Sequence, residues 1–331
     1  MPIPTRNGYN FLGWFTSASG GTQISETTTV TGNVTYWAHW EKVDPFNTAF
    51  ANAGKSKLNG YYKMQDMASS ICSSVTGPTT TTEDISTQLI DTRDNKIYWV
   101  SKLKDGHCWM TQNLDYDIKA SGNEVAVVGG TTTTWNSPNG ATSTSVFDNP
   151  SDTSTHSYDP GSKYLPNGTD SATNITCNST TNGGSNCHYH LGNYYQWNAA
   201  TAGTGGTITN ADATASICPK GWRLPTSNSY TNNYSFGKLT NAYGITNSAH
   251  GSSDANLLSS PLWFVRAGIV NYNSLNKQGT DGYVWSSRAY SDSRFPSDSS
   301  FAHVLDFNSS FADSSDFNIR YVGLSVRCVA E

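Results

Sequence analysis

The chain has 331 residues, a charged fraction of 14% and a formal net charge of -5. Without a cluster of Lys and Arg, this charge disfavours electrostatic capture of nucleic acid or of an anionic membrane. The 10 Trp, 18 Tyr and 12 Phe supply large buried areas, so the low charge does not indicate disorder. No signal peptide and no transmembrane run is visible, and we expect an export signal and anchor to lie outside the chain.

The cysteines are even in number, dispersed and free of a CxxC motif. This pattern favours disulfide bonds formed in an oxidising compartment over a zinc site. The residues alone leave the pairing open, and we expect an extracellular protein. The six positions are Cys72, Cys108, Cys177, Cys187, Cys218 and Cys328.

Short aromatic and β-branched runs alternate with Gly-rich turns over residues 4–40, which predicts a small β module. This stretch resembles the second half of the Listeria–Bacteroides repeat of bacterial surface proteins, with the first strands of the repeat missing. The resemblance implies a stalk or spacer, and we assign it residues 1–42. The matching features are Pro4-Thr5-Arg6, Gly8-Tyr9, Phe11, Gly13-Trp14, Tyr36, Ala38 and Trp40.

Residues 43–61 are interpreted as a linker that leads into a helix over 62–72. In that helix Met64, Met67 and Ile71 have helical spacing and should pack inward.

A strand is predicted from Ile97 to Leu103, where apolar residues alternate. Asp105-Gly106 is a strong hairpin signal, and the chain returns over Cys108 to Leu114. Residues 121–186 are rich in Thr, Ser, Gly and Asn and should form surface loops.

Pro225-Thr226 indicates the start of a helix before Tyr230–Ala242. Two further stretches, residues 283–287 and 323–329, are predicted to be strands.

Four ordered motifs, DTRDNKIYWVSKLKDGHCWMTQNL, CPKGWRLPT, YVWSS and GLSVRCV, resemble the Fibrobacter succinogenes major paralogous domain. The resemblance covers residues 62–331 and implies a C-type-lectin-like fold. That fold would be an α+β domain with a small twisted sheet, two helices and long loops. It also implies three disulfide bonds, which are Cys72–Cys108, Cys177–Cys187 and Cys218–Cys328.

Several C-type-lectin-like proteins are diversified by retroelements that copy a template with errors at adenines. Asn codons then become NNY codons, which cannot encode Lys, Met, Gln, Glu or Trp. None of these five residue types occurs from Ser286 to Ala330, although a loop rich in Ser and Asp could show the same bias. We therefore expect a variable C-terminal segment over residues 286–325.

Within this segment, framework residues of diversified homologues alternate with candidate variable positions. We expect the variable side chains to form one exposed binding face, with the stretch from Ser310 to Ile319 as a loop. Trp285, Leu305, Phe307, Val326 and Cys328 should instead point inward. The candidate ligand-binding positions are Tyr290, Asp292, Arg294, Phe295, His303, Asp306, Asn308, Phe311, Asp313, Asp316, Phe317, Asn318 and Tyr321.

Other chemistry is weakly supported. His188 and His190 beside Cys187 lack a fourth metal ligand, and the triplets of calcium-dependent lectins do not occur. We expect no metal, no cofactor and no catalytic residue.

The leading hypothesis is a diversified binding protein on a bacterial cell surface. Its ligand would be a protein or glycan on another cell or phage. A non-diversified structural or adhesive surface domain is the alternative, and an oxidase related to the formylglycine-generating enzyme is a weaker one.

Overall fold

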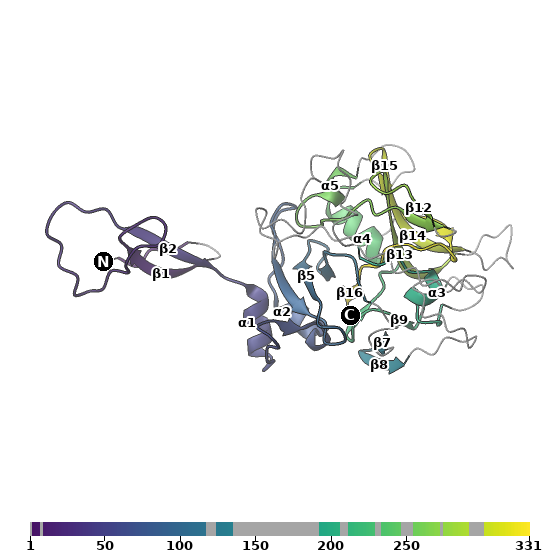
Figure 1. The fold of residues 1–331 in the computed structure, drawn as a ribbon, viewed down its shortest axis with the longest axis horizontal. Helices are drawn as coiled ribbons and strands as arrows, with labels where there is room; N and C mark the ends of the chain where they lie inside the picture. The colour runs from purple at the N-terminus through teal and green to yellow at the C-terminus, as the bar shows by residue number, and fades with distance from the viewer. Residues whose placement is uncertain are drawn as a thin grey trace. The chain divides into compact units, whose positions relative to one another are not determined.

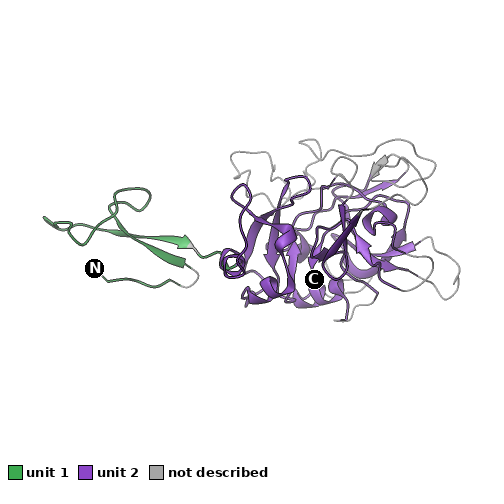
Figure 2. Ribbon diagram, turned by 90° about the horizontal axis from the view of Figure 1, so that it is seen from below, with its two compact units in different colours: residues 1–45 green, residues 46–331 purple. Residues whose placement is uncertain are grey.

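The structure is a computed structural model that divides into two compact units, Met1–Pro45 and Phe46–Glu331 (Figure 2). Each unit is considered by itself. The residues described are 2–6, 9–116, 124–134, 192–205, 211–228, 233–245, 254–271, 274–290 and 301–331.

The first unit is built on two antiparallel strands, β1 (Tyr9–Phe15) and β2 (Trp37–Lys42). A bulge interrupts their pairing between Phe11 and Gly13. Gly13 has a φ of +134°, and a Cβ there would lie 2.4 Å from the side chain of Gln23. Phe11 contacts Trp14 and Trp40 edge-on, with ring centroids 5.7 and 5.4 Å apart. The aromatic residues of the repeat motif therefore form the small apolar cluster that holds this module together.

The second unit begins at Phe46, the second residue of helix α1 (Pro45–Asn52). Phe46 and Phe50 are fully buried and belong to the core of this unit. Phe50 also stacks on Tyr62 at a centroid distance of 4.7 Å. The interpretation of residues 43–61 as a linker is therefore wrong for α1, since two aromatic side chains at i,i+4 spacing anchor it.

The larger sheet of the second unit has six strands, all antiparallel neighbours except the parallel pair β3 and β4. The hairpin between β5 and β6 turns at Asp105-Gly106 as predicted, and Gly106 takes a φ of +86°. The last strand of the chain lies inside this sheet, between β10 and β6. In sheet order the strands are β10 (Trp222–Arg223), β16 (Val329–Ala330), β6 (Cys108–Met110), β5 (Ile97–Lys102), β4 (Ser86–Ile90) and β3 (Tyr62–Lys63).

Two predicted elements differ in the structure. The stretch 62–72 is not one helix but strand β3, a 3-10 helix (Met64–Asp66) and the start of α2 (Ser69–Ser74). The three apolar side chains expected to point inward are nevertheless buried. The stretch 323–329 makes isolated bridges at Gly323, Leu324 and Ser325 before β16, because it crosses several partners instead of following one strand.

A three-stranded sheet carries most of the candidate binding positions. It consists of β13 (Asp281–Ala289), β14 (Phe301–Asn308) and β15 (Phe311–Ile319), in that order. The expectation of a loop over 310–319 is wrong, because β15 pairs with β14 from Asn308↔Phe311 to Phe301↔Ile319. Backbone pairing makes this strand although its Ser- and Asp-rich sequence lacks an apolar alternation.

One face of this sheet packs against helices α4 (Ser235–Ala242) and α5 (Ala255–Leu258) (Figure 1). Leu305 and Phe307 of β14 lie in this apolar cluster with Phe236 and Leu239 of α4. Helix α4 begins at Ser235, later than the predicted stretch Tyr230–Ala242, and the Ser235 backbone N–H donates to Oγ1 of Thr226 at 2.9 Å.

Short elements complete the unit. They are β7 (Glu124–Val127), β8 (Thr131–Thr134), β9 (Ala215–Ser216), β11 (Ile269–Asn271), β12 (Ser274–Asn276) and α3 (Trp197–Ala200). Few helices and several sheets make the chain α+β, as predicted. Within the described ranges, no helix is both long and apolar enough to cross a membrane.

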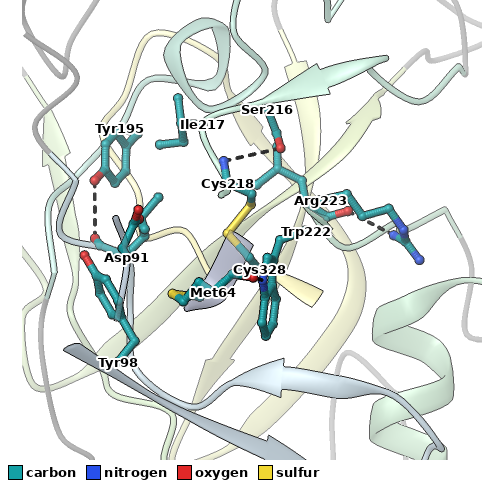
Figure 3. The surroundings of a disulfide bond; sticks show 12 residues. Met64, Asp91, Tyr98, Tyr195, Ser216, Ile217, Cys218, Trp222, Arg223 and Cys328 are labelled. Carbon is teal, nitrogen blue, oxygen red and sulfur yellow. Dashed lines mark hydrogen bonds between the residues drawn. A yellow bond between two sulfur atoms is a disulfide. The ribbon is translucent and has the colours of Figure 1, made fainter. Parts of the chain in front are cut away.

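Two of the three expected disulfide bonds are present. Cys72 joins Cys108, and Cys218 joins Cys328, each with Cα atoms 5.9 Å apart. Figure 3 shows the second bond beside Trp222, whose indole N–H donates to the Met64 carbonyl at 2.9 Å. This bond ties the segment before β10 to the segment before β16. The expected pair Cys177–Cys187 lies outside the described residues.

Candidate binding face of the β13–β15 sheet

The pairing of β14 with β15 brings the candidate binding positions together in space. His303 lies opposite Phe317, Asp306 opposite Asp313, and Asn308 opposite Phe311. Cross-strand neighbours of this kind have Cβ atoms within about 5.5 Å. Residues from two strands that alternate with framework positions in the sequence thus become direct neighbours.

Four rings form an aromatic cluster at one end of the sheet: Tyr290, Phe301, His303 and Phe317. Tyr290 stacks on Phe317 with centroids 4.0 Å apart, and Phe301 meets Phe317 edge-on at 5.5 Å. His303 lies edge-on to Tyr290 at 5.2 Å. Phe317 is 40% exposed, and Tyr290 and Phe301 are half-buried. This end of the sheet therefore offers clustered aromatic area to a ligand.

Phe301 was missed among the candidate positions. It falls inside the segment 286–325 and belongs to the residue types that NNY codons encode. The restricted alphabet was therefore the signal that would have included it.

His303 is buried, with 4% of its surface exposed, so its expected place on the open surface is wrong. Its Nδ1 lies 3.1 Å from the carbonyl oxygen of Ser315, and Tyr290 covers the ring. Burial lowers the pKa of His303 below its usual value. His303 is thus a neutral ring that supports the aromatic cluster.

Four aspartates from three strands form an acidic cluster: Asp281 on β13, Asp306 on β14, and Asp313 and Asp316 on β15. Asp306 lies opposite both Tyr283 and Asp313 in the strand register. The side chains of Asp306 and Asp313 are 8% exposed, so the expectation that they project into solvent is wrong. They lie between paired strands, and the neighbouring side chains cover them.

Charge repulsion in the acidic cluster is relieved by a proton. Burial, and then the nearby charge and hydrogen bond of Asp316, raise the pKa of Asp306 to about 8. Burial likewise raises the pKa of Asp316. Two neighbouring carboxyl groups cannot both ionise without a large cost in free energy, so the Asp306–Asp316 pair holds a proton near neutral pH.

Lys277, in the turn between β12 and β13, contributes a cation to the acidic cluster. Its Nζ lies 2.7 Å from the hydroxyl of Tyr283 and 3.8 Å from Oδ1 of Asp281. The residue has a φ of +59°, and its side chain is 54% exposed.

Some candidate side chains shape the backbone. Oδ1 of Asn308 accepts hydrogen bonds from the backbone N–H groups of Ser310 and Phe311, at 2.8 and 3.2 Å. Oδ1 of Asp313 accepts from the backbone N–H of Ser315 at 2.8 Å. Such contacts are typical of Asn and Asp at turns and bulges.

The remaining candidates are more scattered. Tyr321 follows β15 and is 42% exposed, while its carbonyl accepts a hydrogen bond from Gln196 at 2.7 Å. Phe311 and Asn318 are half-buried. Asp292, Arg294 and Phe295 lie outside the described residues.

The positions expected to point inward do so. Trp285, Leu305, Phe307, Val326 and Cys328 are all fully buried. Leu305 and Phe307 lie on the helix-covered face, whereas Asp306 between them lies on the opposite face. On β14, Leu305 and Phe307 thus alternate with Asp306 and Asn308 between the two faces of the sheet, whereas His303 shares the face of Leu305 and Phe307.

Across the described ranges, no group of three or more His, Cys, Asp or Glu side chains is arranged to hold a metal ion.

No curated protein and no solved structure matches the chain. Residues 1–39 match the model of the Listeria-Bacteroides repeat domain, so the N-terminal module is similar to that bacterial repeat, as its motif indicated.

Proposed function

We propose that this chain is a ligand-binding protein of a bacterial cell surface whose C-terminal sheet face is varied by a diversity-generating retroelement. The observation that carries the proposal is the meeting of Tyr290, Phe301 and Phe317 in one partly exposed aromatic cluster. All three come from the segment with the restricted residue alphabet.

The composition of the face suits a binding site. Tyr and Phe give rigid contact area at low entropic cost, while Asn, Ser and Asp give adaptable hydrogen bonds. The buried framework of β13 and β14 would hold the backbone while exposed side chains change. The proposed fold of the second unit is C-type-lectin-like, and the ligand is a protein or glycan on another cell or phage.

The disulfide bonds support an extracellular site of action, since such bonds persist in oxidising compartments. The N-terminal repeat would serve as a spacer that carries the second unit away from the cell surface. No catalytic role is proposed.

The alternative is an adhesive domain with a fixed face. Burial of His303, Asp306 and Asp313 favours this alternative at those three positions, since a random residue there would disturb packing. Diversification would then be concentrated at the more exposed positions, such as Phe317 and Tyr321.

DNA sequencing tests the proposal. The 3′ end of the gene is sequenced from many cells of one population, together with a few kilobases of flanking DNA. We expect a template repeat, a reverse-transcriptase gene, and substitutions confined to codons of residues 286–325. Invariant codons without a template would overturn the proposal and leave the fixed adhesive domain.

A further inference from the structure

We propose, resting on the binding function above, that the β13–β15 sheet recognises a protein ligand through a cationic side chain, an Arg or Lys seated in the acidic cluster. The ligand would thus present a basic residue to the face of the sheet that carries Asp306 and Asp316.

The first argument is charge. In the described part of the chain, four carboxyl groups face this site, from Asp281, Asp306, Asp313 and Asp316, against the single ammonium group of Lys277. Because Asp306 and Asp316 share a proton near neutral pH, three negative charges less one positive charge leave a formal excess of two. Tyr283 and His303, the other titratable groups that face the cluster, are neutral at pH 7 because burial raises the pKa of the first and lowers that of the second.

The second argument is an unsatisfied atom. Oδ1 of Asp306 is buried and has no hydrogen-bond partner among the described residues. Its side chain is more than nine-tenths buried and faces Tyr283 and Asp313 across the strands. An acceptor left without a donor in such a place costs free energy, and a donor from outside would recover it.

Lys277 shows that an alkylammonium group fits at the edge of this cluster. Its Nζ donates a hydrogen bond of 2.7 Å to the hydroxyl of Tyr283, while half of its side chain stays in solvent. An exposed lysine held by few contacts is readily displaced, because surface ion pairs contribute little free energy. We infer that Lys277 competes with the cation of the ligand.

Asp316 and Phe317 are neighbours on β15, so their side chains point to opposite faces of the sheet, and the aromatic cluster lies on the face away from Asp306 and Asp316. An Arg or Lys side chain has an apolar stem and a charged head. A ligand residue of this kind would place its head among the carboxylates and its stem along the neighbouring side chains of the same face. A side chain fits this site better than an inorganic ion, given the lack of a metal-holding group in the described ranges.

Proton linkage follows from the same geometry. The proton shared by Asp306 and Asp316 compensates charge in the free protein, and an incoming cation would take over this role. Binding should therefore release protons near neutral pH, and affinity should rise with pH.

The test uses the whole chain and two blocked peptides, acetyl-Gly-Leu-Arg-Arg-Leu-Gly-amide and its twin with citrulline in place of arginine. Citrulline keeps the shape of arginine and removes the charge. Binding is measured by titration calorimetry in two buffers that differ in ionisation enthalpy, and by NMR shifts of β14 and β15 amides. We expect the arginine peptide to bind at least about tenfold more tightly than its twin and to release protons.

Three variants test whether the peptide binds at the acidic cluster. The double variant Asp306→Asn with Asp316→Asn should weaken binding of the arginine peptide at least about fivefold. Lys277→Asn should strengthen binding of the arginine peptide, because the competing cation is gone. The variant should fold, since Asn tolerates the positive φ at this position. Glu26→Gln removes an equal charge in the N-terminal unit and should change nothing. If the double Asp variant does not fold, the Lys277 variant still decides the question.

Several outcomes would overturn the inference. Equal binding of both peptides would rule out recognition of a cationic side chain. Unchanged binding in both the double Asp variant and the Lys277 variant would rule it out as well. Displacement of the peptide by millimolar calcium at the same amides would identify a metal site instead. If Phe317→Ala abolishes binding while the Asp variants do not, the binding function stands and only the cationic partner is wrong.

Discussion

The carboxyl groups of Asp306 and Asp316 are joined by a hydrogen bond between neighbouring strands. One of the two must therefore carry a proton, and the raised pKa of Asp306 indicates that it does so up to about pH 8. This relationship connects the stability of the sheet to pH.

Asp306→Asn should make the free energy of unfolding less dependent on pH. An unfolded Asp ionises near pH 4, whereas folded Asp306 stays protonated to about pH 8. The stabilisation that this group contributes is complete below about pH 4 and is lost as pH rises through about 8. Asn keeps a donor for Asp316 and does not titrate.

The measurement is thermal or urea unfolding of parent and variant from pH 5 to pH 9, with Glu26→Gln as the control. We expect the variant to gain stability relative to the parent as pH rises. A constant difference over this range would show that Asp306 ionises normally.

Phe307→Ala and Phe317→Ala should differ strongly in their effect on folding. Phe307 is fully buried, meets Phe264 edge-on at 5.8 Å, and lies against Gly282, where a Cβ would be 2.0 Å from its ring. Its loss should cost about 3–5 kcal/mol. Phe317 is 40% exposed, and its loss should cost far less and act mainly on binding. Urea unfolding measures both, and similar costs would place Phe317 in the core.

Exposed and buried candidate positions should also separate when they are changed in pairs. Phe317→Ser with Tyr321→Ser should leave folding nearly intact, because both side chains are about 40% exposed. Asp306→Leu with Asp313→Leu should destabilise the sheet, since Asp313 accepts a backbone hydrogen bond from Ser315. Melting temperatures of the two double variants give the comparison. If both pairs melt like the parent, all four positions tolerate variation.

Cys218→Ser with Cys328→Ser should lower the free energy of unfolding by about 2–4 kcal/mol, because the bond closes a long loop of the unfolded chain. Peptide mapping without reductant should recover Cys72 joined to Cys108 and Cys218 joined to Cys328. Free thiols at these positions, or exchanged pairs, would contradict the structure.

Limited proteolysis should cut near Val43 and Asp44 and spare helix α1. Phe46 and Phe50 hold this helix in the core, so cleavage there requires local unfolding. Phe50→Ala should open α1 to the protease, whereas Asn52→Ala, at an exposed position, should not. Equal cleavage of α1 in parent and Phe50→Ala would show that the segment is a linker after all.

Sequence patterns were reliable where one local rule determined the structure. The Asp105-Gly106 turn, the strand that precedes it and the inward position of Trp285 each followed from turn chemistry or apolar alternation. The disulfide pairing came from resemblance to a family and not from spacing.

Long-range pairing could not be predicted in this way. Strand β15 has no apolar alternation and owes its structure to β14, and burial of Asp306 and Asp313 depends on the strands beside them. Helix α1 was missed because two phenylalanines in a polar stretch are a weak periodic signal, although their i,i+4 spacing was visible.

The place of β16 has a consequence for protein synthesis. Val329 and Ala330 of β16 complete the six-stranded sheet. Cys218 forms its disulfide bond with Cys328, which is 110 residues further along the chain. A frameshift or stop codon anywhere between Ser286 and Tyr321 would remove both β16 and Cys328. The truncated product would carry Cys218 without its partner and a sheet with its inner strand missing. Only a gene read through to its last codons yields a protein that can close its own sheet.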